Sequence, residues 1–206
     1  DAGSGESNIR GYLLENDWLE AIIQLPNDLF YNTGIATYIW VITKDKAIER
    51  TGKVQLIDAG KCSVKRRKAL GNKRNELDDE SIRMITEAYT NFTDNTYTSG
   101  DKVVESKIKD NDDFKYTKVV VERPLLDEEG KPVLKKGKPE PDSALRDTES
   151  IPFKEDIPTY MEANVLPFAP DAWIDEKKTK IGYEIPFTRE FYKYTAPRSS
   201  DEIYST

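Results

Sequence analysis

The residues of this chain that could take part in chemistry fall into an aromatic pair and a basic run. Phe30 and Tyr31 are neighbours within residues 18–43, the stretch richest in apolar and β-branched side chains. Residues 61–74 contain seven basic side chains and no acidic one, in a chain whose formal net charge is −7. Such a run indicates either a solvated loop that balances nearby acidic residues or a contact with phosphate groups, and the sequence favours neither.

The common catalytic and metal-binding patterns are missing from the sequence. It has no histidine and one cysteine, Cys62, which removes the usual zinc ligands, the usual general base near neutral pH and any internal disulfide. Asp17, Asp28 and Asp58 lie near the ends of expected strands, but no pair of them has a spacing that marks an acid and a base. Residues 3–5, Gly-Ser-Gly, follow no strand and lack the third glycine of a phosphate-binding fingerprint. We therefore expect no catalytic, cofactor-binding or metal-binding residue in this chain.

Apolar runs of strand length are expected to position the aromatic pair. Residues 18–25 and 35–43 predict two buried strands, and Pro26 and Gly34 bound the loop between them. A short helix is expected over residues 7–16, with Ile9, Tyr12 and Leu13 on one face, and a further strand over 53–58. This order predicts the edge of an α/β sheet. The loop with the aromatic pair lies at one strand end, where such sheets bind ligands.

Beyond residue 60 the patterns are weaker. A helix is expected from Asp78 to about Asn91, with an apolar face made of Ile82, Ile85, Tyr89 and Phe92. Residues 93–113 indicate a linker or a poorly packed crossing, 114–123 a strand, and 127–142 a projecting hairpin or loose loop. Residues 151–206 are rich in proline and aromatic residues, with short helical patterns at 155–164 and 187–194. They indicate an arm that packs on a partner or on another part of a longer protein.

The composition limits the size of the core. Hydrophobic residues make up 37% and charged residues 33% of the 206 positions, so part of the chain is expected to be extended. No apolar run is long enough to span a bilayer, and we expect a cytoplasmic protein with no membrane partner. The sequence does not begin with methionine and is expected to be a piece of a longer protein.

Several segments together form a recognisable pattern. The clearest are residues 3–10, 19–41 and 52–59, the second of which reads Leu-Glu-Ala-Ile-Ile-Gln-Leu-Pro and continues to Ile-Ala-Thr-Tyr-Ile-Trp-Val. Shorter ones are 70–74, 121–125, 146–149, 170–175 and 182–189. The chain resembles the modification (methyltransferase) subunit of type I restriction–modification systems. The resemblance covers nearly the whole chain, and residues 93–113 and 127–142 are its least distinctive parts.

This resemblance implies an adenine-N6 DNA methyltransferase that uses S-adenosylmethionine. Its implied partners are DNA, a DNA-specificity subunit, a restriction subunit and a second copy of the modification subunit. The family's cofactor-binding glycines and its Asn-Pro-Pro-Phe/Tyr motif precede the matched residues, and this sequence contains no Asn-Pro or Asp-Pro pair. The fragment alone is therefore expected to bind no cofactor and to be inactive.

The resemblance also implies a division of the chain and an α/β fold class. Residues 1–92 would be the C-terminal part of a Rossmann-like, S-adenosylmethionine-dependent methyltransferase sheet, with a strand–loop–strand hairpin and flanking helices. Residues 93–150 would be a linker with a strand and a projecting loop. Residues 151–206 would be an extended, partly helical arm for subunit packing.

In related adenine methyltransferases an aromatic residue stacks on the target base after it has been flipped out of the duplex. Phe30 resembles that residue, and Tyr31 is a neighbour whose role the sequence does not separate from it. The alternative is that Phe30 only plugs the end of the sheet. On the same interpretation the contacts to the DNA backbone would come from Lys65, Arg66, Arg67, Lys73 and Arg74. Two rival functions remain: a non-catalytic protein-interaction arm, and a stand-alone DNA-binding module built on residues 61–74.

Overall fold

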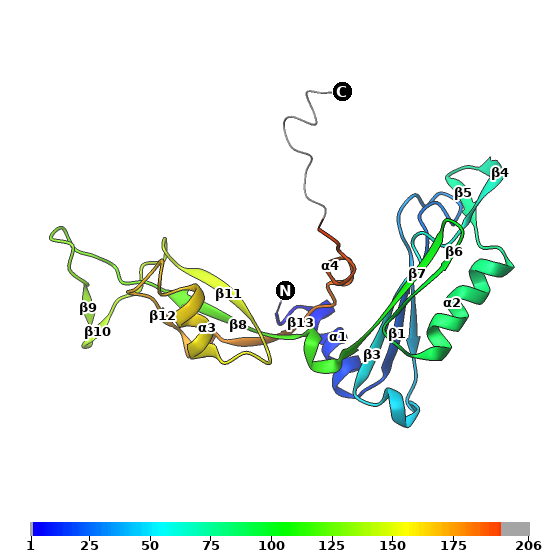
Figure 1. The fold of residues 1–206 in the computed structure, drawn as a ribbon. Coiled ribbons are helices and arrows are strands. Elements are labelled where there is room, and N and C mark those ends of the chain that lie inside the picture. Colours follow the sequence, from blue (N-terminus) through cyan, green and yellow to red (C-terminus); the bar gives the residue numbers. More distant parts are fainter. Residues whose placement is uncertain (1, 195–206) are drawn as a thin grey trace.

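A computed structural model describes residues 2–194 of the chain. Figure 1 shows two lobes. The first lobe, residues 2–114 and 184–194, contains a five-stranded sheet, and the second lobe, residues 115–183, contains a smaller sheet. In the part of the chain that is described, no helix is long and apolar enough to cross a membrane.

The main sheet consists of β1 (Leu19–Gln24), β2 (Tyr38–Ile42), β3 (Lys53–Asp58), β6 (Asn95–Ser99) and β7 (Lys102–Asp110). Their order across the sheet is β2-β1-β3-β7-β6. β1 and β3 are parallel, and the other neighbours are antiparallel. The α/β fold class and the strands expected over 18–25, 35–43 and 53–58 are confirmed. A short 3₁₀ helix, η1 (Ile48–Arg50), lies between β2 and β3.

The expectation that both strands of the first hairpin are buried is wrong for β2. β1 lies between β2 and β3 and is almost entirely buried. β2 is an edge strand on which Tyr38, Ile39, Trp40 and Ile42 are each 41–51% exposed. Its apolar composition therefore does not reflect burial within the described part of the chain.

The linker expected over residues 93–113 is also wrong, because β6 and β7 form a hairpin that completes the sheet. The inward positions of β7 are Lys102, Val104 and Ser106. Because two of these three buried residues are polar, the strand lacks the alternation of apolar and polar residues by which a sequence reveals a strand. The ammonium of Lys102 lies 2.7 Å from Asp78 and 3.0 Å from Glu80. The hydroxyl of Ser106 accepts a hydrogen bond from the buried Gln55. These partners make burial of the polar side chains tolerable.

Helix α2 (Asp79–Asn91) covers one face of the sheet, and Asp78 caps its first turn by accepting the Ser81 amide. Met84, Ile85 and Ala88 pack against Ile57 and Val104. The expected apolar face is half right: Ile85 and Tyr89 contact this core, but Ile82 is 51% exposed and Phe92 ends the helix in a left-handed conformation.

Helix α1 (Gly5–Glu15) and the C-terminal segment pack with the opposite face of the sheet. The core there joins Leu14 and Leu19 to Phe114, Tyr183 and Phe187. The face expected for α1 is wrong for Ile9 and Tyr12, which are exposed, whereas Leu13 packs against this core as expected. The buried residues of α1 are Ser7, Gly11 and Leu14. Gly11 packs directly against the Tyr183 ring, which occupies the space that a larger side chain at this position would need.

Part of the C-terminal arm packs against the first lobe of the same chain. Phe187 begins α4 (Phe187–Glu190), is buried, and contacts the rings of Tyr38 and Phe191. The expectation that this segment packs on a partner or on another part of a longer protein is therefore wrong for Phe187, which lies in the core of this chain. The end of the expected arm, residues 195–206, lies outside the described residues.

The second lobe is built around β8 (Lys115–Glu122), which confirms the strand expected there and follows η2 (Asn111–Phe114). One edge of β8 pairs with β11 (Asp147–Pro152), and the other pairs with β12 (Trp173–Ile174) and β13 (Lys180–Tyr183). Helix α3 (Ile157–Asn164), expected over 155–164, packs on Val119 and Ile151. β12 and β13 are joined through η3 (Glu176–Lys178).

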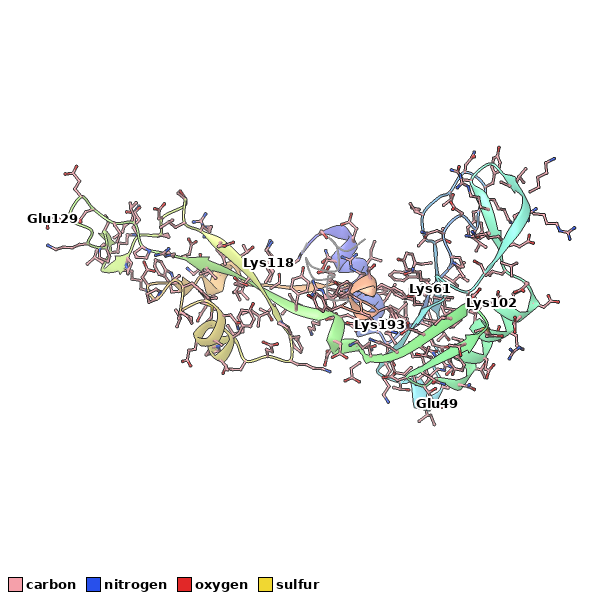
Figure 2. All side chains as sticks on the ribbon, turned by 45° about the horizontal axis from the view of Figure 1, so that its top comes forward. Glu49, Lys61, Lys102, Lys118, Glu129 and Lys193 are labelled. Carbon is pink, nitrogen blue, oxygen red and sulfur yellow. The ribbon has the colours of Figure 1, made fainter. Side chains whose placement is uncertain are left out.

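A hairpin projects from the far end of the second lobe, as expected for residues 127–142. It contains β9 (Leu134–Lys135) and β10 (Lys138–Pro139). Glu129 lies at the tip furthest from the first lobe in Figure 2. The boundaries expected at residues 92 and 150 stay a prediction.

Candidate nucleic-acid interface

The loop over residues 26–34, called here the aromatic loop, is anchored at its base and open at its tip. Leu25 and Leu29 are buried in the core beneath α2. Phe30 is 47% and Tyr31 60% exposed, so neither ring is a core plug. The Thr33 amide donates to the Phe30 carbonyl and closes the tip in a tight turn.

The basic run forms a hairpin and not a loop. β4 (Val64–Leu70) pairs with β5 (Lys73–Glu76), and Gly71 has the positive φ of 60° that the turn requires. We call this element the basic hairpin. Most of its side chains are exposed, and Arg66 is braced by an ion pair of 2.5 Å to Glu76. Its two strands are mostly charged and lack the alternating apolar positions that mark a half-buried strand, so the sequence did not predict them.

The aromatic loop and the basic hairpin are held together by residues that lie more than forty positions apart in the sequence. The amides of Arg74 and Asn75 both donate to the Asp28 carbonyl, at 3.0 and 3.1 Å. The side-chain amide of Asn75 donates to the Asn27 carbonyl at 2.9 Å. These bonds fix the hairpin beside the loop (Figure 1).

Tyr31 makes a further contact between the two elements. A Cβ atom built on Gly71 would lie 2.9 Å from the Tyr31 ring, so the ring rests directly on the hairpin turn. Phe30 has no ring contact or side-chain hydrogen bond among residues 2–194. The structure thus distinguishes the two aromatic residues: the Tyr31 ring contacts the basic hairpin, and the Phe30 ring does not.

A cavity of about 490 Å³ lies between the aromatic loop and the basic hairpin. Its charged lining consists of one carboxylate, on Asp28, and four cations, so its electrostatic potential favours an anion. The full lining is Asp28, Lys65, Arg66, Arg67, Ala69, Arg74 and Asn75. Of the five expected backbone contacts, four line this cavity, and Lys73 lies outside it at the start of β5.

The residues that assemble this site have little signal in the sequence. Asp28 adopts a left-handed conformation with φ of 55°, which is favourable for Asp and Asn, and it stands out in the sequence only as a strand-end aspartate. Asn75 acts through its backbone and amide groups, and Gly71 acts through its missing side chain. A glycine between two short polar runs was the one available signal of a turn.

The other candidate groups have structural partners. Burial raises the pKa of the Asp17 carboxyl, but hydrogen bonds from Lys46, the Gly52 amide and Asn111 outweigh it, and the pKa is lowered. Asp58 accepts the Gly60 amide at 2.8 Å. Burial raises the pKa of the Cys62 thiol, so it is a poor nucleophile near neutral pH. Within residues 2–194, no three or more His, Cys, Asp or Glu side chains are grouped so that they could hold a metal ion.

Comparison with known proteins gives a consistent set of relatives. A family model described as N-6 DNA Methylase matches residues 2–128. The chain is similar to the methylase subunit of the type I restriction enzyme MjaVIII of Methanocaldococcus jannaschii, with 37% identity over 92 residues. It is also similar to the MpnII methylase subunit of Mycoplasma pneumoniae, with 32% identity over 84 residues.

These matches are partial on both sides. The first covers 45% of this chain and 16% of the MjaVIII subunit, and the second 41% of this chain and 14% of the MpnII subunit. Among solved structures, a type I restriction–modification methyltransferase subunit from Streptococcus thermophilus matches with a TM-score of 0.44 and 26% identity. That match covers 54% of this chain and 21% of the other. The chain thus spans only a small part of the length of its relatives.

Proposed function

Since this chain belongs to the N-6 DNA methylase family, we propose that it is part of an adenine-N6 DNA methyltransferase subunit of a type I restriction–modification complex. The resemblance to type I modification subunits is confirmed by the family match and the curated relatives. The proposed contribution of this part is to contact the target base and the DNA backbone and to dock neighbouring subunits.

The observation that carries the proposal is the attachment of an exposed aromatic loop to a basic hairpin. A flipped-out base costs a few kcal/mol of pairing and stacking, and an aromatic face returns about 1–3 kcal/mol. Phe30 has the free ring that this stacking needs. Lys65, Arg66, Arg67, Lys73 and Arg74 supply positive charge for the phosphates beside it. Tyr31 fixes the aromatic loop on the hairpin turn and adds apolar surface near the base.

The glycines of the described chain give no support to a binding site for the methyl donor that the family implies. Gly3 and Gly5 are the glycines nearest a helix start, and they follow no strand. We propose that S-adenosylmethionine and the catalytic residues are held by another part of the subunit, and that this fragment alone is inactive. The open, apolar edge of β2 is where the remaining sheet would pair with this part.

Docking of neighbouring subunits would use the second lobe and the C-terminal segment. Phe168 is 85% and Leu134 is 65% exposed there, so each offers apolar surface that a partner subunit could cover. The proposed partners are the DNA-specificity subunit, the restriction subunit and a second modification subunit, in the cytoplasm. This exposed surface is the observation that favours the rival function of a pure interaction arm.

Replacing Phe30 in the intact subunit, assembled with its partners, tests the proposal. Phe30→Ala should slow methylation roughly 5- to 150-fold, because the lost stacking is worth about 1–3 kcal/mol. Phe30→Trp should keep most of the rate, and Phe168→Ala should leave it unchanged while weakening assembly. A wild-type rate for Phe30→Ala in a normally assembled complex would refute base stacking and favour the interaction arm.

A further inference from the structure

The cavity between the aromatic loop and the basic hairpin has features of a site for one discrete anion. Four cations and one carboxylate line it, and among the described residues the ion pair of Arg66 with Glu76 is the one that any of these cations makes. Arg66 is fixed on one side by Glu76, which accepts from its Nη1, while its buried Nε has no hydrogen-bond partner among residues 2–194. An unpaired buried donor is costly, and an anionic acceptor would satisfy it.

Arg66 and Arg74 come from the two strands of the hairpin. The strand register pairs Lys65 with Asn75, so each arginine is the next residue toward the turn on its own strand. Both side chains line the same cavity. Each guanidinium group has two N–H donors in a fork that matches two oxygens of a phosphate. Lysine ammonium groups act as point charges and lack this geometric match.

The cavity is also fixed in place relative to Phe30. Asp28 lines the cavity, its carbonyl holds the hairpin, and Phe30 follows two residues later. In the proposed DNA complex, a phosphate in the cavity would therefore lie beside the nucleotide that Phe30 contacts, because the loop that carries Phe30 also lines the cavity.

We infer that this cavity binds a single DNA backbone phosphate next to the target nucleotide, with Arg66 and Arg74 as its forked ligands and Asp28 as an opposing charge. The inference rests on the proposed DNA contact and makes it specific. The basic hairpin is then a clamp for one phosphate and not only a source of nonspecific attraction.

Charge-conserving substitutions in the full 206-residue chain test the clamp. Binding of a short fluorescent DNA duplex with an adenine opposite an abasic site is measured as a function of salt. Arg66→Lys and Arg74→Lys should each weaken binding about tenfold with an unchanged salt slope, because the charge stays and the fork is lost. The control Lys73→Gln, outside the cavity, should lower the slope by about 0.9 for one lost phosphate contact.

A gain of affinity provides a second test that misfolding cannot imitate. Asp28→Asn keeps a residue that tolerates the left-handed backbone and removes the opposing charge, so binding should tighten about three- to tenfold. The control is Glu49→Gln, which removes one negative charge at the opposite end of the sheet (Figure 2).

The outcomes separate the clamp from the underlying DNA contact. If both arginine-to-lysine variants keep wild-type affinity, or if Asp28→Asn tightens binding no more than Glu49→Gln, the clamp is refuted while the DNA contact stands. If the unaltered chain shows no salt-dependent binding of the duplex, both the clamp and the proposed DNA contact fail.

Discussion

The contact between Gly11 of α1 and Tyr183 of β13 gives a sharp test of how the structure is held together. A Cβ atom on Gly11 would lie 2.6 Å from two carbons of the Tyr183 ring, well inside the 3.4 Å at which ordinary contact begins. The ring is 9% exposed and cannot easily withdraw. The Tyr183 amide donates to the Ser7 hydroxyl at 2.9 Å, Arg10 donates to the Tyr183 carbonyl at 2.8 Å, and the phenol donates to Glu15.

Two opposing effects set the expected size of the change in Gly11→Ala. Overpacking costs about 1–3 kcal/mol, and replacing glycine by alanine inside a helix returns about 1 kcal/mol. We therefore expect a net loss of about 1 kcal/mol in the free energy of unfolding. For a chain of this size that lowers Tm by about 2–4 °C.

Thermal and urea unfolding, followed by circular dichroism, measure the effect. The matched control is Gly5→Ala in the same helix, where a Cβ would meet no atom within 4 Å. It should be as stable as the wild type or slightly more stable. If Gly11→Ala proves as stable as Gly5→Ala, the packing of α1 on β13 is not as described and the reasoning is refuted.

Three further predictions concern the core, the open edge and a buried charge. Phe187→Ala should cost about 3 kcal/mol in urea unfolding, since the ring is buried between aromatic neighbours, whereas Tyr192→Ala, at a site 70% exposed, should cost little. Trp40→Lys on β2 should reduce concentration-dependent self-association of the isolated chain in light scattering; an unchanged mass distribution would show that this edge is not the contact. Burial opposes ionisation of Glu122, but hydrogen bonds from Lys178 and Arg146 outweigh it and hold its pKa below the usual 4.5. Its stabilising effect is therefore present above that pH and lost as pH falls through the lower folded value, so the Tm values of wild type and Glu122→Gln should differ at neutral pH and converge in acid.

Strands with continuous apolar character could be predicted from the sequence, and strands with polar inward positions could not. β1 and β3 are flanked on both sides and packed on both faces, so their runs of Ile, Leu and Val are a direct signal. β7 buries Lys102 and Ser106, whose partners Asp78 and Gln55 are remote in the sequence. Nothing local to residues 93–113 reveals those partners.

The candidate site shows the same limit. Phe30 and the basic residues could be selected by residue type, and four of the five cations do line one cavity. What places them there is a carbonyl on Asp28, two backbone amides and a bare glycine turn. Backbone groups carry no residue-type signal, so the joining of the aromatic loop to the basic hairpin became visible only in the structure.

The path of the chain between the lobes has a practical consequence. The chain leaves the first lobe through η2 and returns to it along β13. Tyr183 and Phe187 therefore pack in the same core as Leu14 and Phe114. A protease that cleaves the exposed tip near Glu129 would therefore produce two polypeptides that stay associated through this shared core. Such a molecule should run as one band on a native gel and as two after denaturation, and the pieces expressed separately should complement one another.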